Sequence, residues 1–249
     1  MASKNSEPFC TIIRQARFLV DSTKKAVVLL SGGMDSATTA AIARDRGYEL
    51  YTIAFDYGQR HRRELQASQA LATAFGVREH QTVTIDLRAF GGSALTDDIA
   101  VPHGRSVAEM GQDIPITYVP ARNLIFLSFA TAFAEVRGAD AIFIGINQYD
   151  YSGYPDCRQE FLDAFVQTAN LATKAGTQDQ RRLEIIAPLI AFTKADIVTA
   201  GLALQVPFEL TWSCYEGGDA ACGTCDSCLL RLKGFAEAGA VDPISYVNR

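Results

Sequence analysis

Short apolar runs alternate along this chain with longer stretches of helical periodicity. The apolar runs are rich in β-branched and aromatic residues and cover 26–30, 50–55 and 141–146. Each is typical of a strand that is buried on both faces. The stretches with helical periodicity cover 36–46, 63–75 and 123–137. Because strands and helices alternate, we predict a Rossmann-like α/β fold in which right-handed crossovers build a parallel sheet flanked by helices.

Segments with unusual polar chemistry follow the ends of the predicted strands. They read SGGMDS at 31–36, DYGQRH at 56–61 and INQYDYSGYPDCR at 146–158, and VPARN at 119–123 precedes a predicted helix. Ligands of parallel sheets bind outside the carboxyl ends of the strands. We therefore predict that these four segments meet in one site.

The segment SGGMDS fits the binding of a metal-bound polyphosphate. Its two glycines allow a tight turn and a close approach of a ligand, and the following helix offers unpaired N–H groups. Ser31 and Ser36 supply hydroxyl donors, whereas Asp35 would repel phosphate unless Mg²⁺ or a donor group stands between them. The segment has neither the GxxxxGK[ST] nor the GxGxxG pattern. The plainer alternative is a tight turn before a capped helix.

A cluster of four cysteines near the C-terminus is the second strong feature. Cys214, Cys222, Cys225 and Cys228 supply enough thiolates for a closed tetrahedral Zn²⁺ site. Four ligands leave no open position, so the predicted role is structural. The spacing also permits an iron–sulfur cluster, and a disulfide or a chance cluster is the remaining alternative.

The size of the chain indicates one main domain with appended segments. With 249 residues, 48% of them hydrophobic, the chain can bury one full-sized core. We expect an N-terminal extension at 1–25, with an amphipathic stretch at 9–20, a nucleotide-binding domain at 26–205 and a cysteine-rich segment at 206–249 that packs on it. Residues 91–113 form a long irregular loop in this interpretation, and a lid over the site is one reading of it.

Charge and hydrophobicity disfavour two classes of partner. The net charge is −5, so no strong overall field attracts nucleic acid or an anionic membrane. No apolar run approaches the roughly 20 residues of a membrane helix, and the first residues lack the apolar core of a secretion signal. We therefore expect a cytoplasmic protein with neither a membrane nor a nucleic acid partner.

Several segments carry a resemblance to a known family. SGGMDS resembles the pyrophosphate-binding loop of the N-type ATP pyrophosphatases, the PP-loop superfamily, whose members cleave ATP to AMP and pyrophosphate. Within that superfamily the chain resembles the 7-cyano-7-deazaguanine synthases, from Ala26 nearly to the C-terminus. The matching segments are FDYGQRH, YVPARN, DYSGYPDCR, PLIAFTKADIV, TWSCYEGG and CGTCDSC. The residues before Ala26 fall outside the resemblance.

The resemblance implies a reaction in the biosynthesis of queuosine and related deazapurines. The synthases of this family convert 7-carboxy-7-deazaguanine and ammonia to 7-cyano-7-deazaguanine with ATP, through an adenylated carboxylate and an amide. Because loss of water from the amide needs oxygen activation again, a second ATP is expected. The resemblance also favours zinc over an iron–sulfur cluster and implies a homodimer whose other partners are these small molecules.

The resemblance gives roles to residues 31–36, the phosphate loop, and to two cations. Five residues should hold the β- and γ-phosphates, with Asp35 near Mg²⁺. They are Ser31, Gly32, Gly33, Asp35 and Ser36. Asp56 follows the second predicted strand, and from that position we expect it to border the nucleotide. Arg122 and Lys194 are the expected cations at the reaction centre, although a lone basic residue is ordinarily a surface charge.

The segment DYSGYPDC is shaped for a planar ligand. A guanine-like edge presents two adjacent N–H donors, which one carboxylate, Asp150 or Asp156, can accept together. Tyr151 or Tyr154 can stack on the ring. Asp and Gly also serve ordinary turn chemistry, which is the alternative for any one of these residues. Cys157 has no paired base in the sequence, so we interpret it as a packed side chain.

Two other functions compete with the synthase. A PP-loop sulfur transferase that modifies tRNA would use the cysteines to carry sulfur or a cluster, but the acidic composition disfavours it. A nucleotide sensor without catalytic activity would bind ATP and release no pyrophosphate.

Overall fold

The computed structural model describes residues 24–104, 114–147, 154–179 and 181–247. Within them, five parallel strands form one sheet in the order β3-β2-β1-β4-β5. The strands are β1 (Lys25–Leu29), β2 (Glu49–Asp56), β3 (Glu79–Thr84), β4 (Ala141–Phe143) and β5 (Glu184–Ile186). This confirms the predicted parallel sheet. No helix in these residues is long and apolar enough to cross a bilayer.

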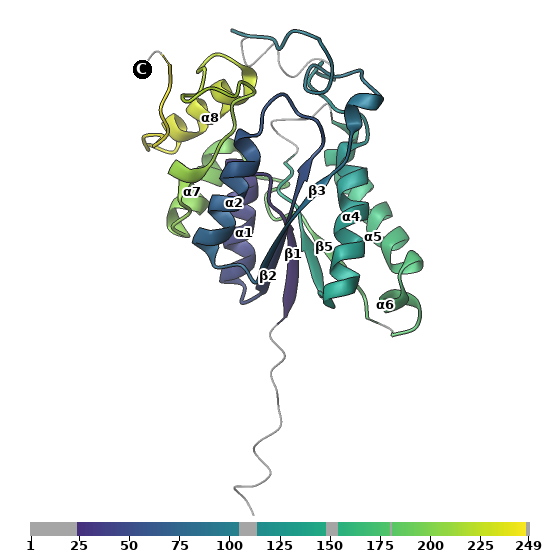
Figure 1. The fold of residues 1–249 in the computed structure, drawn as a ribbon. Coiled ribbons are helices and arrows are strands. Elements are labelled where there is room, and N and C mark those ends of the chain that lie inside the picture. The colour runs from purple at the N-terminus through teal and green to yellow at the C-terminus, as the bar shows by residue number, and fades with distance from the viewer. Residues whose placement is uncertain (1–23, 105–113, 148–153, 180, 248–249) are drawn as a thin grey trace, which may run out of the picture.

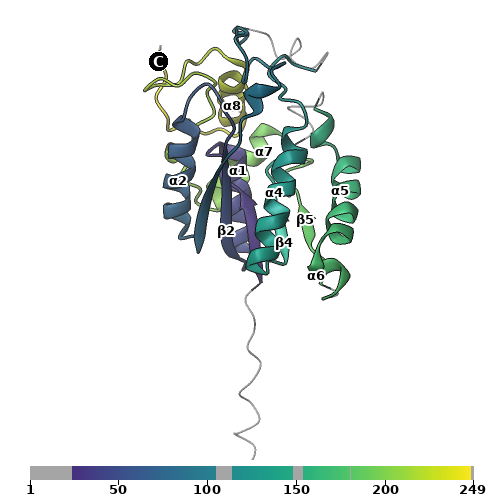
Figure 2. The same ribbon diagram turned by 45° about the vertical axis from the view of Figure 1, so that its right-hand side comes forward.

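Helices cover both faces of the sheet (Figures 1 and 2). One face carries α1 (Met34–Asp45), α2 (Arg63–Phe75) and α7 (Lys194–Ala203), and α8 (Asp226–Glu237) packs against α7. The other carries α4 (Arg122–Arg137), α5 (Gln159–Ala172) and the short α6 (Lys174–Thr177). Single 3₁₀ turns, η1 (Leu87–Ala89), η2 (Pro155–Cys157) and η3 (Phe208–Leu210), lie in the connections. The three predicted helices correspond to α1, α2 and α4.

The alternation of side chains in β1 explains its uninterrupted apolar sequence. Ala26 and Val28 face a core formed with α1, α2 and α7, whereas Val27 and Leu29 face a second core formed with α4 and α5. All four are buried. A central strand of a parallel sheet is covered on both faces, so polar residues have no exposed face to occupy.

The hydrophobic pattern did not predict β3 and β5. β3 is an edge strand whose side chains are all partly or fully exposed, and its sequence EHQTVT is mostly polar. β5 has three residues, EII, at the other edge. Edge strands keep less of their surface in the core, so they lack the apolar run that marked β1 and β2.

The C-terminal segment lies at the end of the sheet where the strands end (Figure 1). Its buried residues form a third cluster around Trp212 and the cysteines, together with Ala94 and Val101. The described part of the expected lid, 91–104, therefore packs against this segment, and the Gly104 N–H donates to the Thr224 carbonyl. Residues 105–113 and the amphipathic stretch at 9–20 lie outside the described residues.

The strand order places a ligand crevice beside β1. The chain connects β1 to β2 on one side and returns to place β4 on the other. Crevices form at such points of reversal, outside the carboxyl ends of the strands. The residues that follow β1 and β4 are therefore in position to form a site.

Candidate active site

The turn between β1 and α1 forms the floor of a pocket. The Ser31 hydroxyl lies 3.1 Å from the Ser36 hydroxyl, which donates to the Gly33 carbonyl at 2.9 Å. Gly33 is the N-cap of α1, and no side chain caps that end of the helix. The first N–H groups of α1 are therefore available to an anion, and the helix dipole favours a negative charge there.

Gly32 is the residue at which this turn requires glycine. Its φ is +95°, and a Cβ there would lie 2.2 Å from the Glu64 carbonyl oxygen. Its own carbonyl accepts the Trp212 N–H at 2.9 Å. The phosphate loop is therefore pressed between α2 and the C-terminal segment.

Gly32→Ala should abolish tight ATP binding, because α2 or the loop must move to admit the methyl group. Gly47→Ala is the matched control: Gly47 has a φ of +81° but open space around its Cβ position. Both variants should lose about 1–2 kcal/mol of stability from left-handed backbone strain. Calorimetric titration with ATP and Mg²⁺ should show a loss of affinity for Gly32→Ala alone. Equal affinities in the two variants would contradict the assignment of the loop.

An ion pair joins the phosphate loop to the start of α7. The Lys194 ammonium lies 2.7 Å from Asp35 Oδ2, and both side chains are largely buried. Asp35 Oδ1 is also buried and has no hydrogen-bond partner among the described residues. An unused carboxylate oxygen beside an anion cradle fits a magnesium ligand, because Mg²⁺ in nucleotide sites takes one or two carboxylates together with phosphate oxygens.

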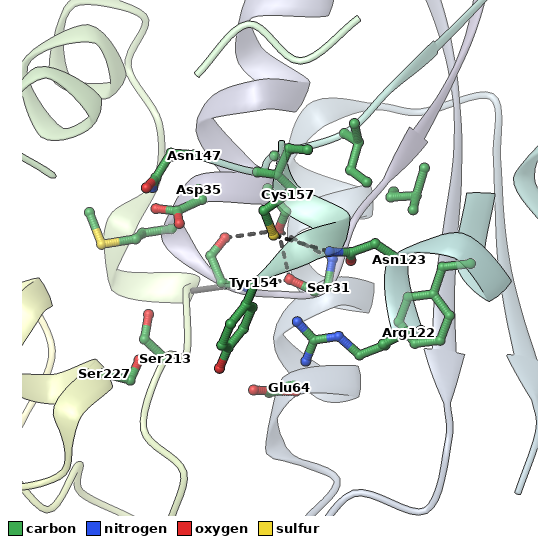
Figure 3. A pocket seen from close by; sticks show the side chains of 18 of the residues that line it. Ser31, Asp35, Glu64, Arg122, Asn123, Asn147, Tyr154, Cys157, Ser213 and Ser227 are labelled. Atoms are coloured by element: carbon green, nitrogen blue, oxygen red, sulfur yellow. Dashed lines mark hydrogen bonds between the residues drawn. The ribbon is translucent and has the colours of Figure 1, made fainter. Parts of the chain in front are cut away.

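Arg122 reaches the pocket from the first position of α4. Its guanidinium points into the pocket, toward Glu64 (Figure 3). Burial opposes its charge, but the neighbouring Tyr57, Tyr154 and Cys157 keep the pKa of Arg122 above its usual range. The pocket therefore holds a permanent positive charge, which can bind and orient an anionic substrate.

Asp156 holds the beginning of α4 in place. Its Oδ2 accepts the backbone N–H of Asn123 at 2.9 Å, and the Asn123 amide donates to the Asp156 carbonyl. Asp156 is buried and does not line the pocket, and its Oδ1 has no hydrogen-bond partner among the described residues. The Asp156 carboxylate therefore caps the N-terminus of α4, the helix that carries Arg122. The cap comes from η2, which is distant in the sequence.

Asp156→Ala should lower the free energy of unfolding by about 1–3 kcal/mol, because a buried N–H loses its acceptor. Asp86→Ala is the control, since Asp86 accepts the N–H of Arg88 in an exposed turn. Urea unfolding of the two variants measures the difference. Equal midpoints would contradict the capping role of Asp156.

The wall formed by η2 contributes an aromatic ring and a thiol. The Tyr154 ring lies 5.2 Å from that of Tyr118, and its hydroxyl lies 3.2 Å from that of Thr117. Burial raises the pKa of Cys157 to about 12, and the Asn123 amide donates to its sulfur. A thiol with this pKa stays protonated near neutral pH, so Cys157 is not suited to act as a nucleophile.

Glu64, in the first turn of α2, places a carboxylate in the same pocket. Within the described residues its oxygens have no hydrogen-bond or ion-pair partner, and they face the space occupied by the Arg122 guanidinium (Figure 3). Burial raises the pKa of Glu64 to about 7, and the charge of Arg122 opposes the rise. The carboxyl therefore exchanges protons near neutral pH.

The C-terminal segment closes the remaining side of the pocket. Arg231 of α8 is fully buried, forms a bidentate ion pair with Asp242 at 2.7 and 2.9 Å, and donates to Thr211 at 2.7 Å. Ser213 and Ser227 add hydroxyl groups to this wall (Figure 3). The ion pair with Asp242 satisfies the charge of Arg231 and fixes α8 beside the pocket.

The structure brings seven of the expected site residues together. The pocket is lined by Ser31, Gly33, Asp35, Ser36, Arg122, Tyr154 and Lys194. Gly32 shapes the loop without lining the pocket. Asp56, at the end of β2, pairs with the exposed Arg62 at 3.3 Å and does not line it. Asp150 and Tyr151 lie outside the described residues, so their roles stay predictions.

The sequence patterns did not indicate Glu64, Arg231, Ser213 or Ser227 as site residues. The two serines lie in the segments TWSCYEGG and CGTCDSC, so the resemblance could have indicated them. Glu64 and Arg231 lie outside every matching segment. An acidic residue in a first helical turn is common, and an arginine in a cysteine-rich helix reads as a surface charge. No local signal marked either of them.

The four cysteines converge beside this wall. Their sulfur atoms all lie within 4.8 Å of one another, and those of Cys222 and Cys228 are 3.9 Å apart. Tetrahedral zinc with ligands at about 2.3 Å requires sulfurs about 3.8 Å apart, so the set fits a structural zinc ion. Donation from the Cys225 and Cys228 thiols, and from the N–H groups of Cys222 and Glu216, lowers the pKa of Cys214.

Trp212 connects the cysteine cluster to the phosphate loop. The Trp212 indole N–H donates to the Cys214 carbonyl at 3.0 Å, and His61 Nε2 lies 3.1 Å from the same oxygen. Since the Trp212 backbone N–H donates to the Gly32 carbonyl, one residue spans both features. Through these two hydrogen bonds of Trp212, the cysteine cluster therefore helps to position the phosphate loop.

Comparison with known proteins identifies the family of this chain. The family model described as "Queuosine biosynthesis protein QueC" matches residues 25–239. The chain belongs to the QueC family. The match covers the phosphate loop, both cations and the cysteine cluster, and it ends in the residues that follow α8.

Named relatives extend over nearly the same range. The 7-cyano-7-deazaguanine synthase of Kineococcus radiotolerans is 60% identical over 225 residues, which are 90% of this chain and 98% of that protein. The synthase of Desulfatibacillum aliphaticivorans is 58% identical over 226 residues, 90% of this chain and 97% of that protein. That of Thermoplasma acidophilum is 56% identical over 223 residues, 90% and 92% of the two chains. These similarities support a function in the queuosine pathway.

Proposed function

We propose that this chain is an ATP-dependent carbon–nitrogen ligase that converts 7-carboxy-7-deazaguanine and ammonia to 7-cyano-7-deazaguanine, with release of AMP and pyrophosphate. The observation that carries the proposal is the shared pocket: a phosphate loop and two cations face one space in a chain similar to synthases of this name. A carboxylate is a poor electrophile, and this combination suits its activation by adenylation.

The phosphate loop and Lys194 would act on ATP. The uncapped N-terminus of α1, with Ser31 and Ser36, would hold the β- and γ-phosphates. Asp35 would be a ligand of Mg²⁺, which neutralises phosphate charge when bound. Lys194 would place its ammonium beside the group that leaves. Positioning and electrostatic stabilisation supply most of the catalysis in such phosphate chemistry.

Arg122 and Tyr154 would hold the deazapurine. The guanidinium can orient the carboxylate of the substrate, and the Tyr154 ring can stack on its plane. Recognition of the guanine-like edge stays assigned to Asp150 or Asp156 by prediction. Because Asp156 already accepts a backbone N–H of α4, Asp150 is the stronger candidate. Tyr151 stays a predicted stacking partner, and Asp56 stays a predicted neighbour of the nucleotide.

Cys214, Cys222, Cys225 and Cys228 would hold one structural zinc ion, with no part in the chemistry. The ion would fix the wall that contains Ser213, Ser227 and Arg231. A homodimer is proposed as well, because the family resemblance implies it. Light scattering of the purified protein tests that assembly.

A pyrophosphate-release assay tests the proposed reaction. The complete mixture contains ATP, Mg²⁺, 7-carboxy-7-deazaguanine and ammonium, and each component is omitted in turn while products are identified by mass spectrometry. Nitrile formation that depends on every component supports the proposal. Pyrophosphate without nitrile, or ATP binding alone, contradicts it, and the latter is the behaviour of a nucleotide sensor.

A further inference from the structure

The proposed reaction requires a proton acceptor beside the nitrogen. In amide formation, the ammonia lone pair forms a C–N bond to the acyl carbon, the C–O bond to AMP breaks, AMP leaves with the electron pair, and nitrogen loses one proton. In nitrile formation, the amide oxygen bonds to the α-phosphorus of a second ATP and pyrophosphate leaves. The C–O bond then breaks with departure of AMP, and nitrogen loses its other two protons. All three protons of ammonia must therefore be removed.

Most titratable groups that line the described part of the pocket are unsuited to this task. Asp35 pairs with Lys194 through Oδ2, and its Oδ1 is the proposed ligand of Mg²⁺. Burial raises the pKa of Tyr57 to about 12 and that of Cys157 to about 12, and it raises the pKa of Tyr154 as well. No histidine lines the described part of the pocket. Acceptors with such high pKa values are almost fully protonated near neutral pH.

We propose that Glu64 is the group that accepts protons from the nitrogen of the substrate, an assignment that rests on the function proposed above. Its carboxylate faces the pocket from α2, opposite the Arg122 guanidinium of α4, and has no hydrogen-bond or ion-pair partner among the described residues (Figure 3). Both of its oxygens are therefore open to a bound N–H group. An acceptor with these properties can release each proton to solvent before it takes the next.

The surroundings of Glu64 support a basic role. Among the described residues, Arg122, Tyr57 and Cys214 are the titratable groups that act on it from neighbouring elements. Burial favours the protonated form of Glu64, and Arg122 favours the carboxylate. The backbone of Glu64 is also in place, because its carbonyl lies against Gly32 of the phosphate loop. The Glu64 side chain therefore starts beside the phosphate loop.

Separation of the two half-reactions tests the proposal. Adenylation removes no proton from nitrogen, so exchange of labelled pyrophosphate into ATP, with 7-carboxy-7-deazaguanine and without ammonium, should be similar in Glu64→Gln and in the unaltered protein. Formation of amide and nitrile with saturating ammonium should fall about 10²–10⁴-fold, the usual contribution of a general base. Glu160→Gln is the matched control, because it removes an exposed carboxylate from the first turn of α5.

Chemical rescue gives a second measurement. In Glu64→Ala, added formate should restore part of the rate of amide and nitrile formation and should leave pyrophosphate exchange unchanged. The proposal is overturned if Glu64→Gln forms nitrile at the unaltered rate. It is also overturned if exchange and nitrile formation fall together and formate restores neither, which indicates a role in substrate placement. Absence of nitrile from the unaltered protein refutes the proposed function itself, before any variant is compared.

Discussion

Lys194→Met should form nitrile about 10²–10³-fold more slowly than the unaltered protein, the cost of removing one preorganised charge from a transition state. The ammonium lies at the start of α7, 2.7 Å from Asp35 of the phosphate loop, and is largely buried. Pyrophosphate exchange should fall by a similar factor, because we assign Lys194 to the adenylation step. Steady-state assays of nitrile formation and of exchange measure both effects.

The control for this variant is Lys233→Met, which makes the same change on the exposed face of α8. Because Lys194→Met also leaves Asp35 without its ionic partner, unfolding in urea should be recorded for both. A further variant with Asp35→Asn added should recover stability without recovering activity. An active double variant would show that Lys194 serves only to neutralise Asp35.

Cys225→Ser should lose the bound metal and destabilise the chain. A structural zinc ion contributes about 10–16 kcal/mol in small zinc-finger peptides. Even a third of that would lower the unfolding midpoint by about 7–20 °C, at about 2–4 °C per kcal/mol for a chain of this size. Elemental analysis and thermal unfolding measure the two effects. Because Trp212 connects the cluster to Gly32, ATP affinity should fall as well.

Cys157→Ser is the control for metal content, since Cys157 is buried outside the cluster. It should retain one equivalent of zinc. Iron and inorganic sulfide in the unaltered protein would show an iron–sulfur cluster instead, as the spacing of the cysteines also permits. An unchanged midpoint for Cys225→Ser would contradict a structural role for the metal.

Much of the fold could be predicted from the local pattern of apolar residues. The strands that this pattern missed share one physical cause. β1 and β2 are covered on both faces, so their sequences show the burial directly. β3 and β5 lie at the edges of the sheet and are partly exposed, so their sequences resemble those of loops. The order of the strands was not predicted from the sequence, because it depends on pairing between segments far apart in the chain.

The candidate site likewise has features that local sequence shows and features that it does not. The phosphate loop was predictable because its chemistry lies in six consecutive residues, and the cysteine cluster because its ligands are closely spaced. Asp156 illustrates the limit: the sequence suggested a reader of the substrate, whereas in the fold its carboxylate accepts an N–H of a helix that begins 34 residues earlier. The substrate role of Asp156 therefore stays a prediction beside an observed structural contact.

The sequence by itself determined the parallel α/β sheet, the glycine-containing turn between β1 and α1, the cysteine cluster and the family resemblance, since each depends on neighbouring residues or a short spacing. Only the tertiary structure decided which distant groups act together. Asp35 and Lys194 are 159 positions apart, and Glu64 faces Arg122 from another helix. Whether a carboxylate is paired, capped or open depends on the atoms within a few ångströms of it, and local sequence does not specify those atoms.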